Sequence, residues 1–141
     1  MTDPLYGKDL LRLAANAAGT GRLHPCDAEG HAHNPTCGDK IGVTLQLDAA
    51  GRIKTLALET KACVLSQASA SILGNAAAGS DLAAIRALRI AVENMLEDGK
   101  PPAPPFADYL HCKGAATFRN RHRCVLLPID AVLNALENAR R

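Results

Sequence analysis

The stretch IGVTLQLDAAGRIKTLAL, residues 41–58, decides the fold class. Residues 41–47 carry an aliphatic side chain at every second position, which is the period of a strand with one buried face. Residues 48–51 supply turn-forming side chains, and residues 53–58 return as a second strand. The stretch therefore predicts an antiparallel hairpin.

Directly after this hairpin the hydrophobic period changes from that of strands to that of helices. Residues 63–73 predict a helix rich in serine and alanine, and a second helix is expected from an N-cap at Ser80 to a stop at Gly99. Four prolines within 101–105 then predict an extended spacer, because no helix or central strand tolerates them.

The two ends of the chain add helices to this pattern. The last helix is expected to begin after Cys124, with Pro128 in its first turn. Residues 9–18 predict a short amphipathic helix, whereas residues 22–39 are interpreted as a loop. The sum is an α+β fold in which helices pack on one side of a small antiparallel sheet, as a single domain over residues 1–141.

The composition excludes several classes of protein. The 141 residues are 48% hydrophobic and 21% charged, which is typical of a globular rather than a disordered chain. A net charge of +2 and 3% aromatic residues argue against nucleic-acid binding, and no apolar run reaches the roughly 18 residues of a membrane span. The first residues do not form a secretory signal, so we expect a cytoplasmic protein whose five cysteines stay reduced.

The segment NPTCGD, residues 34–39, is the sharpest candidate for chemistry. Cys37 offers a soft sulfur ligand and Asp39 a hard oxygen ligand, a mixture that suits zinc or iron. Gly38 between them tolerates backbone angles that would turn both side chains toward one point. The alternative interpretation is a turn with a buried cysteine and a capping aspartate.

Two further cysteines lie where a thiolate would be favoured. Cys63 stands at the start of a helix, whose backbone N–H groups and dipole stabilise negative charge, and Cys124 follows the basic run 121–123. The alternatives are a core cysteine at a strand–helix junction and an exposed basic edge. With Cys37 and Asp39, these cysteines would form a Cys₃Asp set without the paired Cys-x-x-Cys spacing of common structural zinc sites.

Three histidines are further candidates. His31 and His33 are spaced to share a strand face shortly before Cys37, so a zinc site containing them is conceivable, although surface loop histidines are the favoured interpretation. His122 stands beside Cys124 and could reach the same metal. The sequence leaves open whether any of the three enters a coordination shell.

Three ordered motifs resemble the signatures of the U-type iron–sulfur cluster assembly proteins, the family of IscU, SufU and the N-terminal domain of NifU. They are NPxCGD at 34–39, ACxxSQASAS at 62–71 and RxxC at 121–124, and the resemblance runs from Leu5 to the C-terminal helix. It implies a three-stranded antiparallel sheet with helices on one face. It also implies a cysteine desulfurase as sulfur donor and apo iron–sulfur or carrier proteins as recipients.

The resemblance assigns roles to residues motif by motif. It implies that Cys37, Asp39, Cys63 and Cys124 bind the cargo, which is iron in a transient 2Fe–2S cluster or a Zn²⁺ ion. Cys124 would also accept the persulfide, with Arg121 as a supporting charge.

Departures from the family pattern indicate the SufU branch. Arg123 stands where the IscU branch has a histidine, the segment before Cys124 lacks a Leu-Pro-Pro-Val-Lys motif, and the stretch from Cys63 to Cys124 is longer than in IscU. Ala62 replaces a glycine that usually precedes the second cysteine. The leading hypothesis is a non-enzymatic assembly scaffold. The alternatives are a zinc-dependent sulfurtransferase that never builds a cluster, and a structural zinc domain, which a carboxylate at Asp39 disfavours.

Overall fold

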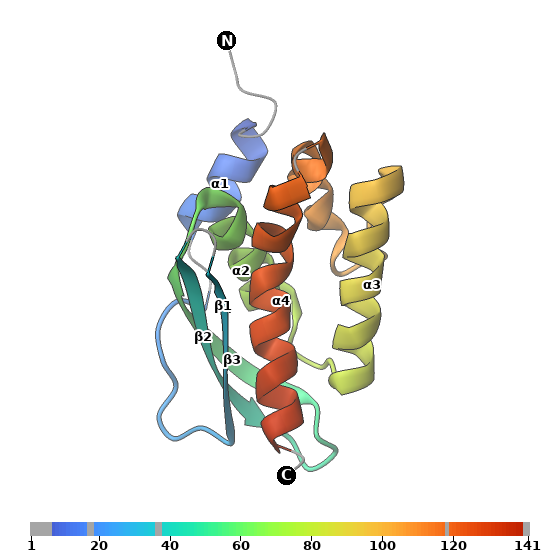
Figure 1. Ribbon diagram of the computed structural model, residues 1–141. Helices are drawn as coiled ribbons and strands as arrows, with labels where there is room; N and C mark the ends of the chain where they lie inside the picture. The colour runs from blue at the N-terminus through green and yellow to red at the C-terminus, as the bar shows by residue number, and fades with distance from the viewer. Residues whose placement is uncertain (1–6, 17–18, 36–37, 118, 140–141) are drawn as a thin grey trace.

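The computed structural model describes residues 7–16, 19–35, 38–117 and 119–139 (Figure 1). The elements along the chain are α1 (Lys8–Asn16), β1 (Ala28–Asn34), β2 (Asp39–Leu47), β3 (Ile53–Lys61), α2 (Val64–Ala76), α3 (Leu82–Asp98), the 3₁₀ helix η2 (Ala107–Thr117) and α4 (Arg119–Ala139). None of the helices in these ranges combines the length and the apolar composition that a membrane span needs.

The three strands form one antiparallel sheet in the order β1-β2-β3. Strands β2 and β3 are the predicted hairpin, and the Asp48 N–H donates to the Arg52 carbonyl across its turn at 2.9 Å. Ile41, Val43 and Leu45 of β2 are buried beneath the helices, as their alternation predicted. The predicted fold class is confirmed: an α+β fold with a three-stranded antiparallel sheet and helices packed on one face (Figure 1).

Strand β1 lies where the sequence predicted a loop, so the interpretation of residues 22–39 was wrong for 28–34. Its sequence AEGHAHN has no large aliphatic residue to produce a period-two pattern. Strand β1 is therefore stabilised by its pairing with β2 and its packing against α4, and not by the strand propensity of its own residues. Gly30 makes that packing possible, because a Cβ there would lie 2.3 Å from the Ala135 nitrogen and 2.6 Å from the Ala131 carbonyl oxygen.

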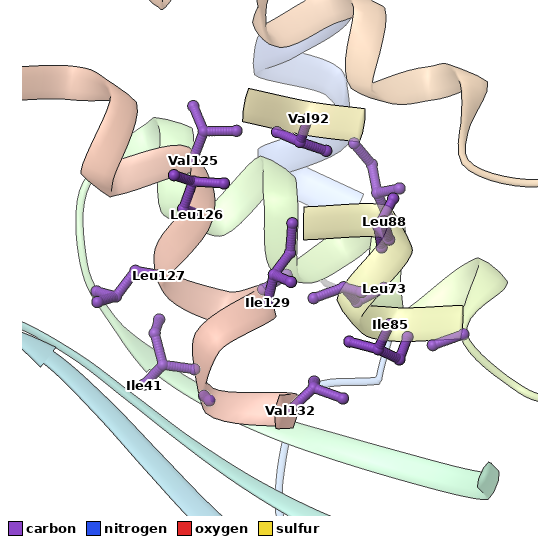
Figure 2. Close-up of a cluster of buried hydrophobic side chains, with 14 of the residues drawn as sticks. Ile41, Leu73, Ile85, Leu88, Val92, Val125, Leu126, Leu127, Ile129 and Val132 are labelled. Atoms are coloured by element: carbon purple, nitrogen blue, oxygen red, sulfur yellow. The ribbon is translucent and has the colours of Figure 1, made fainter. Parts of the chain in front are cut away.

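Helix α4 is the centre of the core. It lies between the sheet and α3, and also contacts α2 and η2. Figure 2 shows its apolar side chains between Ile41 of the sheet and the row of α3 that includes Leu88 and Val92. Residues 124–129 are all buried, so this part of α4 is surrounded by other elements.

The starts of α4 and α3 differ from the prediction. Helix α4 begins at Arg119, before Cys124 rather than after it, because the polar run 119–123 carries no apolar period to reveal a helix. Pro128 therefore lies inside α4. Helix α3 is capped by Asp81, whose carboxylate accepts from the Ala84 N–H at 2.9 Å, instead of by Ser80.

Other boundaries agree with the sequence. Gly99 ends α3 in the left-handed conformation, with a φ of 81°. Residues 101–105 belong to no helix or strand, as the prolines predicted, although η2 follows them unpredicted. Of the helix expected over 9–18, α1 contains 9–16, and residues 17–18 lie outside the described ranges.

The contact between Gly30 and α4 can be tested by adding one methyl group. Gly30→Ala should destabilise the protein by about 1–3 kcal/mol, because strand and helix backbones must separate to admit the Cβ. Gly42→Ala is the matched control, since its Cβ would meet only the His31 ring at 3.6 Å. Urea unfolding measures both variants, and equal midpoints would show that β1 and α4 do not pack this closely.

Candidate metal centre

Asp39 is a carboxylate on the core face of the sheet. It opens β2 in the same inward row as Ile41 and is only 8% exposed. The turn before it needs glycine at Gly38, whose φ is 74°, and the Gly38 N–H donates to the Asn34 carbonyl at 2.8 Å. Because burial of an unpartnered carboxylate is costly, donors must lie close to Asp39.

Cys63 supplies one of these donors. It is the N-cap residue of α2, with an extended backbone, and its side chain is half-buried. The Cys63 N–H donates to Oδ2 of Asp39 at 3.3 Å. The carboxylate therefore lies at the N-terminus of α2, where the helix dipole stabilises negative charge.

Cys124 supplies the second donor from α4. Its side chain is 2% exposed, and its thiol donates to Oδ2 of Asp39 over 3.9 Å. Helix α4 packs against both β2 and α2, so it carries Cys124 to the junction where Asp39 and Cys63 meet.

The three side chains form a compact group of donor atoms. One carboxylate oxygen of Asp39 and the sulfurs of Cys63 and Cys124 all lie within 4.8 Å of one another. Around a tetrahedral zinc ion with Zn–S bonds of about 2.3 Å, two thiolates lie about 3.8 Å apart. One hard oxygen and two soft sulfurs at this spacing fit a zinc or iron ion.

The surroundings of the Cys63 and Cys124 sulfurs favour a thiolate at Cys63. A hydrogen bond from the Cys124 thiol lowers the pKa of Cys63 to about 6, and a hydrogen bond from the Ser66 N–H acts in the same direction. Burial and the negative charge of Asp39 oppose this shift in the pKa. Near neutral pH Cys63 is therefore a thiolate, the form of cysteine that binds metal, and the single proton of the Cys124 thiol is shared between the Cys63 sulfur and Asp39.

The remaining predicted residues are placed differently. Cys37 lies outside the described residues, two positions before Asp39 in the chain. His31 and His33 lie on β1, exposed on the face of the sheet opposite to Asp39, and His31 is 3.5 Å from Glu29. Neither histidine belongs to the group of donor atoms.

Helix α4 carries two further predicted residues. Arg121 and His122 are half-buried within one turn before Cys124. His122 is not part of the three-residue group among the described residues. Arg121 and His122 therefore lie beside Cys124, as their positions in the sequence predicted. The roles of Arg121 as a supporting charge and of His122 as a metal ligand stay predictions.

Two cysteines lie apart from the site. Cys26 is half-buried in the segment before β1, and Cys112 is buried in η2. Burial raises the pKa of the Cys112 thiol to about 12. Cys112 is therefore a core residue with an inert thiol.

Ser66 is a residue of the site whose individual role the sequence did not reveal. It is fully buried on α2, its Oγ lies 3.8 Å from the Cys63 sulfur, and it donates to the Cys124 carbonyl at 2.7 Å. Its signal was a serine on the inward face of α2, which also carries the buried Ser69, and the sequence explained both only as small residues.

Comparisons with known proteins agree with this geometry. The family model described as NifU-like N terminal domain matches residues 5–123. The iron–sulfur cluster assembly scaffold protein IscU of Streptococcus pyogenes serotype M1 is 29% identical over 108 residues, which span 76% of this chain and 67% of that protein. The zinc-dependent sulfurtransferase SufU of Bacillus subtilis (strain 168) is 30% identical over 102 residues, which span 71% of this chain and 68% of that protein.

Solved structures share the whole fold. The crystal structure of a nitrogen-fixing NifU-like protein (N-terminal) from Brucella abortus superposes with a TM-score of 0.90 at 32% identity, and covers 98% of this chain and 96% of that one. A SUF-system scaffold, FiSufU from Fervidobacterium islandicum AW-1, has a TM-score of 0.79 at 20% identity, with 94% and 96% covered, and shows the fold alone.

The difference between Cys63 and Cys112 predicts how the metal-free protein reacts with iodoacetamide. The Cys63 thiolate persists above about pH 6 and is lost as the pH falls through that value, whereas Cys112 stays a buried thiol. Alkylation followed by mass spectrometry should therefore give a half-maximal rate near pH 6 at Cys63 and no reaction at Cys112. Cys124→Ala should return the Cys63 profile toward higher pH, and an unchanged profile would contradict the thiol–thiolate hydrogen bond.

Proposed function

Because the chain belongs to the family of NifU-like N-terminal domains, we propose that it is a scaffold on which a 2Fe–2S cluster is assembled and from which it is passed on. The observation that carries the proposal is the meeting of Asp39, Cys63 and Cys124, from β2, α2 and α4, within 4.8 Å. Cys37, two positions before Asp39 in the sequence, would complete the set as the third thiolate.

The donor set suits a cargo that must leave again. Asp39 offers an oxygen, which binds iron less tightly than a thiolate in the same place would. Its charge is already shared with the Cys63 N–H and the Cys124 thiol. The carboxylate can therefore exchange between protein donors and a metal without leaving an unpartnered charge in the core.

Sulfur would enter at Cys124 from a persulfide on a cysteine desulfurase. Asp39 accepts the hydrogen bond of the Cys124 thiol and can take its proton. The Cys124 sulfur then attacks the terminal sulfur of the donor persulfide, a new S–S bond forms, and the donor cysteine leaves as a thiolate. Arg121, on the same helix one turn earlier, would support the negative charge that moves through this step.

The partners follow from the same chemistry. A cysteine desulfurase delivers the sulfur, and apo iron–sulfur or carrier proteins receive the finished cluster. Reduced thiols at Cys63 and Cys124 are required throughout, so the proposal places the protein in the reducing cytoplasm.

A second candidate is a zinc-dependent sulfurtransferase that accepts persulfide and builds no cluster. Arg123 instead of a histidine before Cys124 favours it, as does the similarity to the Bacillus subtilis protein named for this activity. In this case the same group, with Cys37, would hold a Zn²⁺ ion, and sulfur transfer would still depend on a cysteine of the site.

The metal content separates the two candidates. Protein purified without oxygen should contain iron and acid-labile sulfide in equal amounts, and Cys63→Ala should lose both, because its thiolate is a proposed ligand. Cys26→Ala, outside the group, is the matched control. Zinc without sulfide would replace the scaffold with the sulfurtransferase, and the absence of any metal would refute the site.

The sulfur acceptor can be identified by mass spectrometry after incubation with a cysteine desulfurase and cysteine. Cys124→Ser should abolish the added 32 Da (about the mass of one sulfur atom), whereas Cys63→Ser should keep it. Cys26→Ser controls for labelling outside the site. Persulfide that survives in Cys124→Ser and vanishes in Cys63→Ser would move the acceptor to Cys63, which is the more exposed of the two sulfurs.

A further inference from the structure

Helix α4 carries a proline at a position that affects a proposed ligand. In an α-helix each backbone N–H donates to the carbonyl four residues earlier, and proline has no N–H to donate. Pro128 lies inside α4, so it deprives the Cys124 carbonyl of its helical donor. The carbonyl belongs to a residue that is 2% exposed, where a polar group needs a partner.

A serine from the neighbouring helix provides that partner. Ser66 of α2 is fully buried, and its hydroxyl donates to the Cys124 carbonyl at 2.7 Å, which is a short and strong geometry. The bond joins α2 and α4 at the level of the donor atoms.

The same hydroxyl lies against the other cysteine of the site. Ser66 Oγ is 3.8 Å from the Cys63 sulfur, and a hydroxyl has only one proton. A carbonyl can only accept, so that proton is directed to the Cys124 carbonyl, while the same oxygen stays in contact with the Cys63 sulfur. Ser66 therefore bridges the residues that carry the two sulfurs.

We propose that Ser66 is a positioning residue. Pro128 has no N–H to donate to the Cys124 carbonyl, and the Ser66 hydroxyl donates to it instead. This bond fixes the spacing of the Cys63 and Cys124 sulfurs before any metal binds. The inference rests on the proposed function, because it assumes that these sulfurs bind metal. Outer partners that orient metal ligands typically change metal affinity about 10–100-fold when removed.

A second serine of α2 provides a matched control. Ser69, one turn along the same inward face, donates to the Val125 carbonyl at 2.7 Å and is also fully buried. It contacts Tyr109 at 2.8 Å and no ligand of the site among the described residues. Ser69→Ala therefore removes the same kind of bond between the same two helices, without touching the sulfurs.

The first experiment measures thermal unfolding of the metal-free protein. Ser66→Ala should lower the unfolding temperature by about 5 °C, since it leaves a buried carbonyl without this donor. In a Pro128→Ala background the restored N–H can donate to the Cys124 carbonyl, so the same substitution should have a clearly smaller effect. Equal effects in the two backgrounds would refute the link between Pro128 and Ser66.

The second experiment titrates Co²⁺ and follows the thiolate-to-metal charge-transfer band. Ser66→Ala should weaken binding about 10-fold or more, and Ser69→Ala should leave the affinity and the spectrum unchanged. If Ser66→Ala alone does not fold, both serine variants are compared in the Pro128→Ala background, where Ser66→Ala should still bind Co²⁺ more weakly than Ser69→Ala, but by a smaller factor, because the restored N–H takes over part of the role of the serine.

The outcomes keep the two proposals apart. A wild-type protein that binds no Co²⁺ through thiolates would refute the proposed function, and with it the role of Ser66. Wild-type binding with equal affinities for Ser66→Ala and Ser69→Ala would refute the role of Ser66 and leave the proposed function standing.

Discussion

The arrangement of the site depends on one buried carboxylate. Asp39 continues the inward row of β2, where Ile41 and Val43 follow as apolar residues, so its charge faces the core instead of water. Such a charge is tolerated only with donors close by. The N-terminus of α2 and the thiol of Cys124 on α4 meet this need, and the two helices are thereby brought to one end of the sheet.

The fold holds these helices in place at several points along α4. Gly30 of β1 lets the backbone of α4 approach the strand more closely than any side chain at this position would allow. Two serines of α2 donate to consecutive carbonyls of α4, those of Cys124 and Val125. The Arg89 guanidinium of α3 donates to Asp130 at 2.6 Å. Helix α4 is thus fixed by its backbone as well as by its apolar side chains, and the position of Cys124 is fixed with it.

The sequence was informative wherever a local pattern coincided with burial. The hairpin, α2 and α3 follow from their hydrophobic periods, and the glycine at the end of α3 follows from its chemistry. Strand β1 could not be found in this way, because it carries no large aliphatic residue and depends on β2 and α4 for its stability. The start of α4 was equally hidden, since residues 119–123 are a run of polar residues without a hydrophobic period.

The site shows the same division between local and tertiary information. Ordered motifs drew attention to Asp39, Cys63 and Cys124, but no spacing in the chain states that residues from β2, α2 and α4 meet within 4.8 Å. His31 and His33 were considered as metal ligands in sequence, with surface positions favoured, and the direction of β1 turns them to the opposite face. The role of Ser66 could not be predicted from the sequence for a related reason, because it depends on the Cys124 carbonyl of another helix.

A site assembled by tertiary structure has a consequence for release of its cargo. Small zinc modules whose ligands lie in local loops fold only with their metal, so metal loss unfolds them. Here the donor atoms stand at one end of a core that α4, α3 and the sheet complete by apolar packing (Figure 2). Most of the core therefore packs without contributions from these donor atoms, and Asp39 has protein donors of its own in Cys63 and Cys124. A protein built in this way can deliver a metal or cluster and remain folded to accept the next, which a structural zinc domain cannot do.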